Sequence, residues 1–130
     1  MSLGENLQRA NWPEKSGEYK VVQLEIDGQP YLRFPIKEYG ENSHAGILMV
    51  LFRKNDIRFQ RIEGVSGATV PALKGEKYKV HGMGKAKIDA EQMHASFYGN
   101  SLDYDIGINA EHLNLIKQLE KDWKIESGKR

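Results

Sequence analysis

Hydrophobic and polar positions alternate with a period of two near the start of the chain. Apolar residues between positions 19 and 26 are interleaved mostly with Lys20, Gln23 and Glu25, which predicts a half-buried strand. Asp27-Gly28 follows, and both central residues of a type I′ turn need positive φ, so a hairpin is expected here. Residues 31–34 form its second strand, which the flanking prolines restrict to a sheet edge or to strand ends.

The apolar spacing then becomes helical in two places. In residues 43–54, Asn42 or Ser43 can cap a helix, and basic residues in the last turn suit its dipole. A second helix is expected near residues 110–121, after Asn109 as its cap. The apolar positions that share one helical face are Ile47, Leu48 and Leu51 in the first helix and Leu113, Ile116 and Leu119 in the second.

The rest of the pattern is that of short strands. Alternation predicts strands at residues 57–62 and 77–83 and a last one at 123–125, with a loop or irregular hairpin over 64–77. Residues 89–107 follow neither period. Two helices are too few for a doubly wound parallel sheet, so we expect an α+β fold, a single mixed sheet of about five or six strands packed with two helices.

The organisation that this predicts is one α+β domain over residues 17–126. A flexible N-terminal arm over residues 1–16 would precede it, and a C-terminal tail over residues 127–130 would follow.

Composition narrows the class of partner. Nineteen basic residues against 18 acidic ones leave a net charge of +1, which argues against a nucleic-acid partner. The chain has no cysteine, so disulfides and thiolate chemistry are excluded. No apolar run approaches the roughly 20 residues of a membrane helix, so no membrane partner is expected. These features favour a cytoplasmic protein.

His44 is the first candidate for chemistry, because it falls in the opening turn of the first helix. Free backbone N–H groups and the positive end of the helix dipole attract anions there, and they keep an imidazole neutral. A neutral imidazole beside a bound anion can act as a general base that activates water. The alternative is an ordinary solvated or capping histidine.

The segment from His81 to Lys87 is the second candidate. Gly82 and Gly84 let the backbone approach a ligand, successive N–H groups can form an anion nest, and two lysines add charge. It is not a Walker loop, because Lys79 stands five positions before Gly84. The alternative is a plain turn. Lys20, on the first strand, is of interest only if the sheet brings it near His44.

Other polar clusters carry weaker signals. The donors His81, His94, Asp89 and Glu91 match no established zinc spacing. Asp103 and Asp105 are expected to be solvated acids in a loop, since carboxylate catalysis needs a pocket. His112, in the first turn of the second helix, is interpreted as a surface residue.

In this order, these segments resemble the Janus/Ocnus family of small phosphohistidine phosphatases. Residues 17–22 resemble its opening strand, and Ser43-His44-Ala45 resembles the segment that carries its catalytic histidine. Residues 79–86 resemble its phosphate-binding strand and loop, and the second helix with residues 123–125 resembles its closing elements. The match is collinear from about residue 16 to 126, but each motif is short.

The resemblance implies a metal-independent phosphatase without a cofactor that acts on phosphohistidine. His44 would be the general base and Lys20 a phosphate contact, and the backbone amides of Gly84, Lys85 and Ala86 would cradle the phosphate. Its phosphorylated ligand would be a protein or a small molecule.

The chain also departs from the pattern of the family. Gly84 stands where the family has a serine, so one hydroxyl contact is absent. A family arginine would be Arg33 or be replaced by Lys37, and a second arginine, near residues 63–65, has no clear counterpart. Residues 91–107 resemble an insertion. Two other functions therefore stay open, a non-catalytic phosphate- or anion-binding module and a protein-interaction domain.

Overall fold

The computed structural model describes residues 8–35, 43–54, 59–65, 69–73, 78–102 and 104–127. Its helices are α2 (His44–Lys54) and α3 (Ala110–Leu119). Its strands are β1 (Gly17–Ile26), β2 (Gln29–Arg33), β3 (Phe59–Glu63), β4 (Thr69–Leu73), β5 (Tyr78–Asp89), β6 (His94–Tyr98), β7 (Asn100–Ser101), β8 (Ile106–Gly107) and β9 (Lys124–Ser127).

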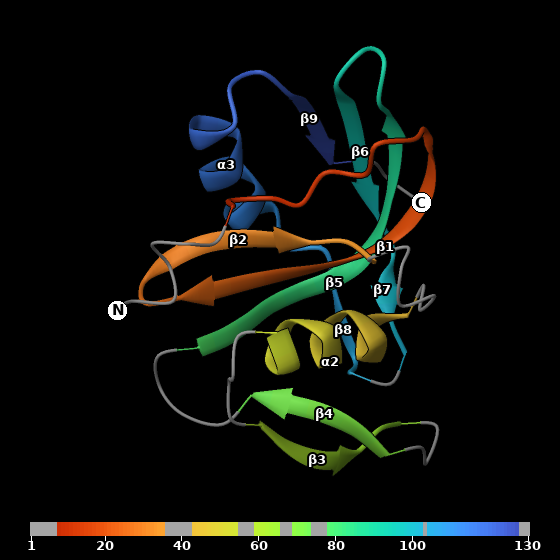
Figure 1. The fold of residues 1–130 in the computed structure, drawn as a ribbon, viewed down its shortest axis with the longest axis vertical. Helices are drawn as coiled ribbons and strands as arrows, with labels where there is room; N and C mark the ends of the chain where they lie inside the picture. The colour runs from red at the N-terminus through yellow and green to blue at the C-terminus, as the bar shows by residue number, and fades with distance from the viewer. Residues whose placement is uncertain are drawn as a thin grey trace.

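A five-stranded sheet in the order β2-β1-β5-β6-β9 forms the centre of the protein (Figure 1). Its neighbouring strands are antiparallel except β6 and β9, which are parallel. The sheet is mixed and strongly curled, and two helices pack on it in the described part of the chain. The predicted α+β class is thus confirmed.

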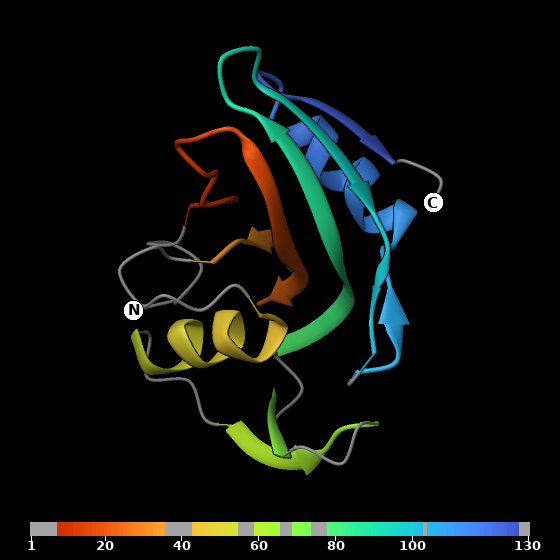
Figure 2. The same ribbon diagram turned by 90° about the vertical axis from the view of Figure 1, so that its right-hand side faces the viewer.

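The two helices cover opposite faces of the sheet (Figure 2). Val21 belongs to the apolar cluster that α3 closes, whereas Val22 belongs to the cluster that α2 closes. Because successive side chains of a strand point to opposite faces, residues 21–24 of β1 are buried on both sides and divide the two cores. Sequence alternation predicted only a half-buried strand, and helices on both faces are the reason for the difference.

The hairpin between β1 and β2 has the predicted turn. Asp27 has φ 50° and Gly28 has φ 80°, which are the positive values that a type I′ turn requires. On the second helix, Asn109 is the predicted cap, because its side chain accepts the N–H of His112. These local signals were sufficient because each one depends on only a few neighbouring residues.

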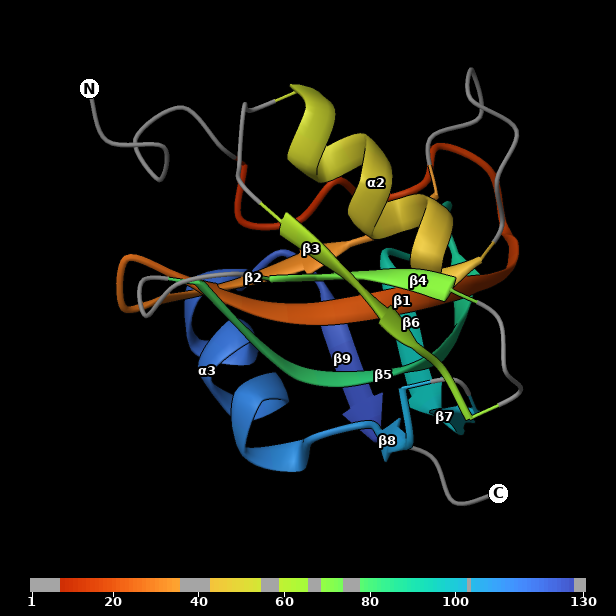
Figure 3. The ribbon, with the colours of Figure 1, turned by 90° about the horizontal axis from the view of Figure 1, so that it is seen from below.

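Two small ribbons complete the fold. β3 and β4 pair antiparallel beside α2 (Figure 3), so the segment interpreted as a loop or irregular hairpin contains the strand β4, which pairs with the preceding strand β3. β5 continues to Asp89, past the predicted end of that strand. The unassigned residues 89–107 supply the end of β5, the strand β6 and the ribbon of β7 and β8.

Residues 8–16, the described part of the predicted flexible arm, lie against the sheet. Ala10 is 5% exposed and forms a parallel bridge with Leu32. Trp12 stacks on Trp123 with ring centroids 4.0 Å apart. The structure therefore places the beginning of the ordered domain before residue 17, since burial of one large aromatic ring holds the segment in place. In the described residues, neither helix has the length and apolarity needed to cross a membrane.

Candidate functional site

A cavity of about 480 Å³ opens where the start of α2 meets the sheet. Four parts of the chain line it, namely β1, the start of α2 with its cap, β5, and the end of β6 with the segment that follows it. Its lining residues are Lys20, Ser43, His44, Ala45, Lys85, Tyr98, Gly99, Asn100, Ser101, Leu102 and Tyr104.

Strand register brings three of these side chains into one row. Lys20 pairs with Lys85 across β1 and β5, and Lys85 pairs with Tyr98 across β5 and β6. All three therefore point to the face that α2 covers. Like charges directly opposite one another on neighbouring strands destabilise a sheet. An anion in this cavity would relieve that repulsion, so the pair of lysines favours anion binding.

His44 enters the cavity from the first position of α2. Ser43 caps the helix, since its Oγ accepts the N–H of Gly46 at 3.0 Å. The imidazole is 6% exposed, and its Nε2 lies 2.8 Å from the carbonyl oxygen of Gly84. A carbonyl can only accept, so Nε2 carries the proton. In the neutral ring, Nδ1 is then the acceptor.

The surroundings keep this imidazole neutral. Burial is the main cause that lowers the pKa of His44 from its ordinary value of 6.5, and the charges of Lys20 and Lys85 lower it further. The bond to the Gly84 carbonyl acts in the opposite direction. The net result is a histidine that is unprotonated at neutral pH in a cavity lined by two cations.

Glu18 contacts two of the three residues in the row across the strands, Tyr98 and Lys85. The hydroxyl of Tyr98 donates a hydrogen bond to the carboxylate of Glu18, and the Nζ atom of Lys85 lies 4.0 Å from the same carboxylate. Glu18 is half exposed, so this ion pair contributes little to stability. It orients Tyr98 and leaves the ammonium of Lys85 within reach of a ligand.

Residues 99–102 form one wall of the cavity, and they belong to the segment 91–107 that was expected to be an insertion beside the site, although none of them was predicted as a site residue. Gly99 has φ 81°, a left-handed conformation that favours glycine, and its carbonyl accepts the N–H of Ile108 at 3.2 Å. Ser101 is 4% exposed, and its Oγ accepts the N–H of Tyr104 at 3.4 Å. The available signal was the run Gly-Asn-Ser directly after an alternating strand, which is typical of a turn.

The predicted amide cradle at Gly84, Lys85 and Ala86 is not a free loop. These residues lie within β5, and Lys85 and Ala86 pair with both β1 and β6, so the sheet engages their backbones. Of the three, only Lys85 lines the cavity. A Cβ atom at Gly84 would lie 2.5 Å from the carbonyl oxygen of Tyr98 and 2.6 Å from Ile108. Close packing of β5 against Tyr98 and Ile108 thus requires a glycine at position 84. The carbonyl oxygen of this glycine accepts the hydrogen bond from Nε2 of His44.

Arg33 does not line the cavity. It is 6% exposed on β2, and its guanidinium donates to the carbonyl oxygens of Leu32 at 2.5 Å and Gln8 at 2.7 Å. Burial lowers its pKa to about 10. Arg33 therefore ties Gln8 to the sheet and is not part of the cavity lining. The alternative, Lys37, lies outside the described residues.

The other candidates are dispersed over the molecule. His81 pairs with Glu25, and His94 pairs with Glu126, each at 3.0 Å. Among the described residues, no three His, Asp or Glu side chains are grouped so that they could hold a metal ion. Asp103 is not a described residue. His112 was predicted at the surface but is 4% exposed, because it faces the polar side chain of Gln23.

No family model matches the chain, and no curated protein matches it either. A function for this protein is accordingly derived from the geometry of the cavity.

Proposed function

We propose that the protein is a metal-independent phosphatase that hydrolyses phosphohistidine. The observation that carries the proposal is the meeting of a neutral histidine and two lysines in one cavity. Phosphoryl transfer depends mainly on positioning and on stabilisation of charge, and these residues can supply both. The ligand would be a phosphorylated protein or a small phosphorylated molecule.

The phosphoryl oxygens would lie between the ammonium groups of Lys20 and Lys85. The hydroxyl of Ser101 can donate a further hydrogen bond, because its oxygen already accepts from Tyr104 and its proton remains to be directed. This hydroxyl would take the place of the serine hydroxyl that the resembled family has at the position of Gly84. A cavity of about 480 Å³ is within the range of small-molecule sites, so a phosphoryl group and the imidazole attached to it can both enter.

His44 would act as the general base. A water molecule held by Nδ1 attacks phosphorus, the P–N bond breaks, and the electron pair of that bond goes to the leaving imidazole. The proton taken up by Nδ1 then passes to solvent or to the leaving nitrogen, and the products are histidine and inorganic phosphate. The bond from Nε2 to the Gly84 carbonyl keeps the ring in the tautomer that this step requires.

The test is release of inorganic phosphate from a phosphohistidine peptide in the presence of a chelator. His44→Ala should lower the rate by about a hundredfold or more, which is the usual contribution of a general base. His94→Ala is the matched control, because His94 is hydrogen-bonded to Glu126 and does not line the cavity. Lys20→Ala should chiefly weaken binding, since its charge acts in the ground state and the transition state alike.

Equal rates for the wild type and His44→Ala would contradict a catalytic role for His44. If the wild type binds phosphate but releases none from the peptide, the protein is instead a non-catalytic anion-binding module. In that case Lys20→Ala should still weaken phosphate binding. If neither phosphate binding nor release is observed, both proposals fail.

A further inference from the structure

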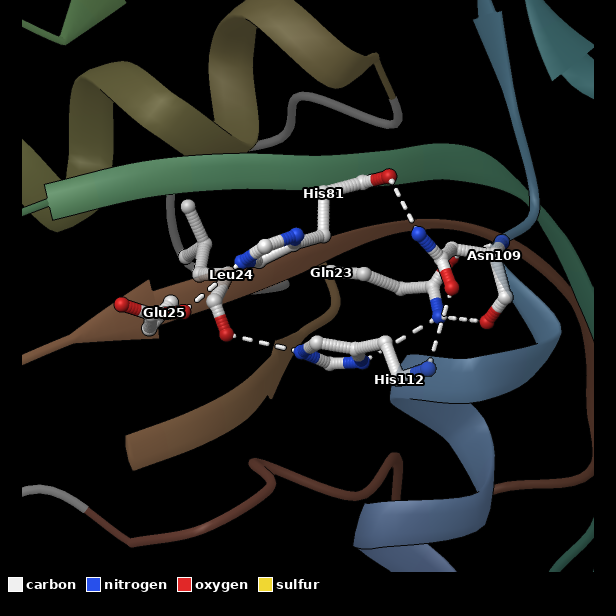
Figure 4. Close-up of polar contacts among 6 residues, drawn as sticks. All are labelled: Gln23, Leu24, Glu25, His81, Asn109 and His112. Atoms are coloured by element: carbon white, nitrogen blue, oxygen red, sulfur yellow. Dashed lines mark hydrogen bonds and ion pairs between the residues drawn. The ribbon is translucent and has the colours of Figure 1, made fainter. Parts of the chain in front are cut away.

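Gln23 is a buried amide on the face of β1 opposite to the cavity. It is 0% exposed and lies three residues after Lys20 on the same strand. Figure 4 shows its side chain between the backbone of Asn109 and the imidazole of His112. Burial of an amide is costly unless its donors and acceptor are satisfied, so its partners indicate what the residue does.

Both ends of the Gln23 side chain bind the backbone of Asn109. Its Oε1 accepts the N–H of Asn109 at 2.7 Å, and its Nε2 donates to the carbonyl of Asn109 at 2.8 Å. The side chain thereby pairs with the backbone as a neighbouring strand would. Gly82 leaves the room for this contact, because a Cβ atom there would collide with Oε1 of Gln23 and lie 2.7 Å from the carbonyl oxygen of Gly107.

We call the pair of hydrogen bonds between the Gln23 amide and the Asn109 backbone the clamp. The backbone next to this clamp leads to residues 99–102, which form a wall of the cavity. Ile108, the neighbour of Asn109, donates its N–H to the carbonyl of Gly99 at 3.2 Å. The β7–β8 ribbon pairs Asn100 with Gly107 and Ser101 with Ile106. Residues 99–101 are thus held by residues 106–108, which in turn are held through Asn109 by Gln23.

We propose that Gln23 is a positioning residue for the anion-binding segment 99–102, and that neutral His112 sets the orientation of its amide. This inference rests on the proposed function only in treating the segment as part of an anion site. Gln23 and Lys20 lie on opposite faces of β1. The same strand therefore presents the ammonium group of Lys20 to the cavity and, through Asn109, holds the wall that residues 99–102 form.

The orientation of the amide depends on the tautomer of His112. Nε2 of His112 lies 2.7 Å from the carbonyl of Leu24 and must donate to it, so Nδ1 accepts the second N–H of Gln23 at 3.2 Å. If His112 became protonated, two N–H groups would face one another. Rotation of the amide to relieve that contact would break both bonds to Asn109.

Several charged or titratable groups face His112. Burial lowers its pKa most, His81 with its ring centroid 5.7 Å away lowers it further, and Glu25 on β1 raises it. Glu111 is its neighbour on α3, and all four residues border a second cavity, of about 140 Å³. Because the pKa lies below its ordinary value, the clamp should be intact at neutral pH and should open only under acidic conditions.

The experiment compares Gln23→Met and Gln23→Glu with the wild type, using sulfate as the probe. Sulfate mimics a phosphoryl dianion and does not change charge over the pH range used. Gln23→Met keeps the volume but removes the amide, so it should weaken sulfate binding about tenfold, the equivalent of roughly one net hydrogen bond. Amide hydrogen exchange at residues 99–102 should become faster in the same variant.

The matched control is Leu113→Ala on the same helix. Leu113 is 2% exposed in the apolar core, so truncation of its side chain destabilises the fold but keeps the amide of Gln23. A merely structural role for Gln23 predicts equal effects of both variants on sulfate binding at matched stability. A positioning role predicts that Leu113→Ala leaves the sulfate affinity within about twofold of the wild type.

Gln23→Glu adds a pH readout that loss of stability cannot imitate. A carboxylate can still accept the N–H of Asn109, but it can accept from Nδ1 of His112 only when that ring is protonated. Relative to the wild type at each pH, sulfate binding by this variant should improve as the pH falls, whereas acid weakens the clamp of the wild type. The ratio at each pH cancels the titration of His44, which all variants share.

The outcomes separate this inference from the proposed function. Unchanged sulfate affinity and unchanged exchange at residues 99–102 in Gln23→Met overturn the positioning role. If the wild type binds no sulfate, the anion site fails, and hydrogen exchange alone decides whether Gln23 fixes the segment. Faster exchange then supports positioning without a ligand, and unchanged exchange overturns it.

Discussion

Replacing Gly84 by alanine tests whether this glycine serves packing or phosphate binding. A Cβ atom there would lie 2.5 Å from the backbone carbonyl of Tyr98, whereas ordinary contacts begin at 3.4 Å, so the two strands must separate by 0.9 Å (3.4 − 2.5). Tyr98 cannot move freely, because it is paired with Lys85 and the next carbonyl, of Gly99, is bonded to Ile108. The added methyl group therefore strains the sheet.

Overpacking of this kind costs about 1–3 kcal/mol, and the lower entropy of the unfolded alanine variant offsets about 0.4–1 kcal/mol of it. For a chain of this size, the net loss corresponds to a fall in Tm of roughly 3–8 °C, measurable by circular dichroism. Gly28→Ala is the control for backbone strain alone, because its φ is 80° and its Cβ atom would meet nothing within 4 Å. An unchanged Tm for Gly84→Ala, with weakened phosphate binding, would refute the packing argument and restore the amide cradle.

Three further predictions follow from buried groups. Trp12→Ala should cost about 1–3 kcal/mol in urea unfolding, because the partly buried ring packs on Trp123, and a loss below about 0.5 kcal/mol would show that residues 8–16 are a loose arm. Arg33→Met should lower stability yet leave the phosphate affinity within about twofold by calorimetry, and a larger loss of affinity would return Arg33 to the site. The free energy of unfolding should fall as pH drops below 6.5, since His44 and His112 have lowered pKa values and only the unfolded chain takes up their protons; a flat profile in urea titrations from pH 7.5 to 5 would contradict this.

The parts of the fold that could be predicted depend on local sequence. The Asp27-Gly28 turn and the Asn109 cap each involve a few consecutive residues, and the two helices begin within one residue of their expected starts. The packing of residues 8–16 could not be predicted, because Trp12 finds its partner Trp123 only in the folded state. Residues 89–107 could not be assigned for a different reason, since the two-residue strands β7 and β8 carry too little periodicity to be recognised.

The site was predictable only in part. His44 was found because a helix start can be recognised in sequence, whereas Lys20 was singled out through the family resemblance, and the structure brings both to the cavity with Lys85. The role of the glycines could not be predicted, because a glycine needed for close packing and one needed for a ligand have the same sequence signature. Only the neighbours of Gly84 in space distinguish these two uses.

The pairing of β1 with β5 also determines when this protein can fold. Gly17 pairs with Ile88 and Ile26 pairs with Tyr78, so β1 must wait for a partner far along the chain, and closing so long a loop costs entropy before contacts form. Such high contact order slows folding. On the ribosome, the edge of β1 would stay unpaired until β5 had emerged, and β9 closes the sheet later still through its parallel contact with β6. Until then the nascent chain exposes one unpaired edge of an apolar strand, and such edges favour aggregation before folding is complete.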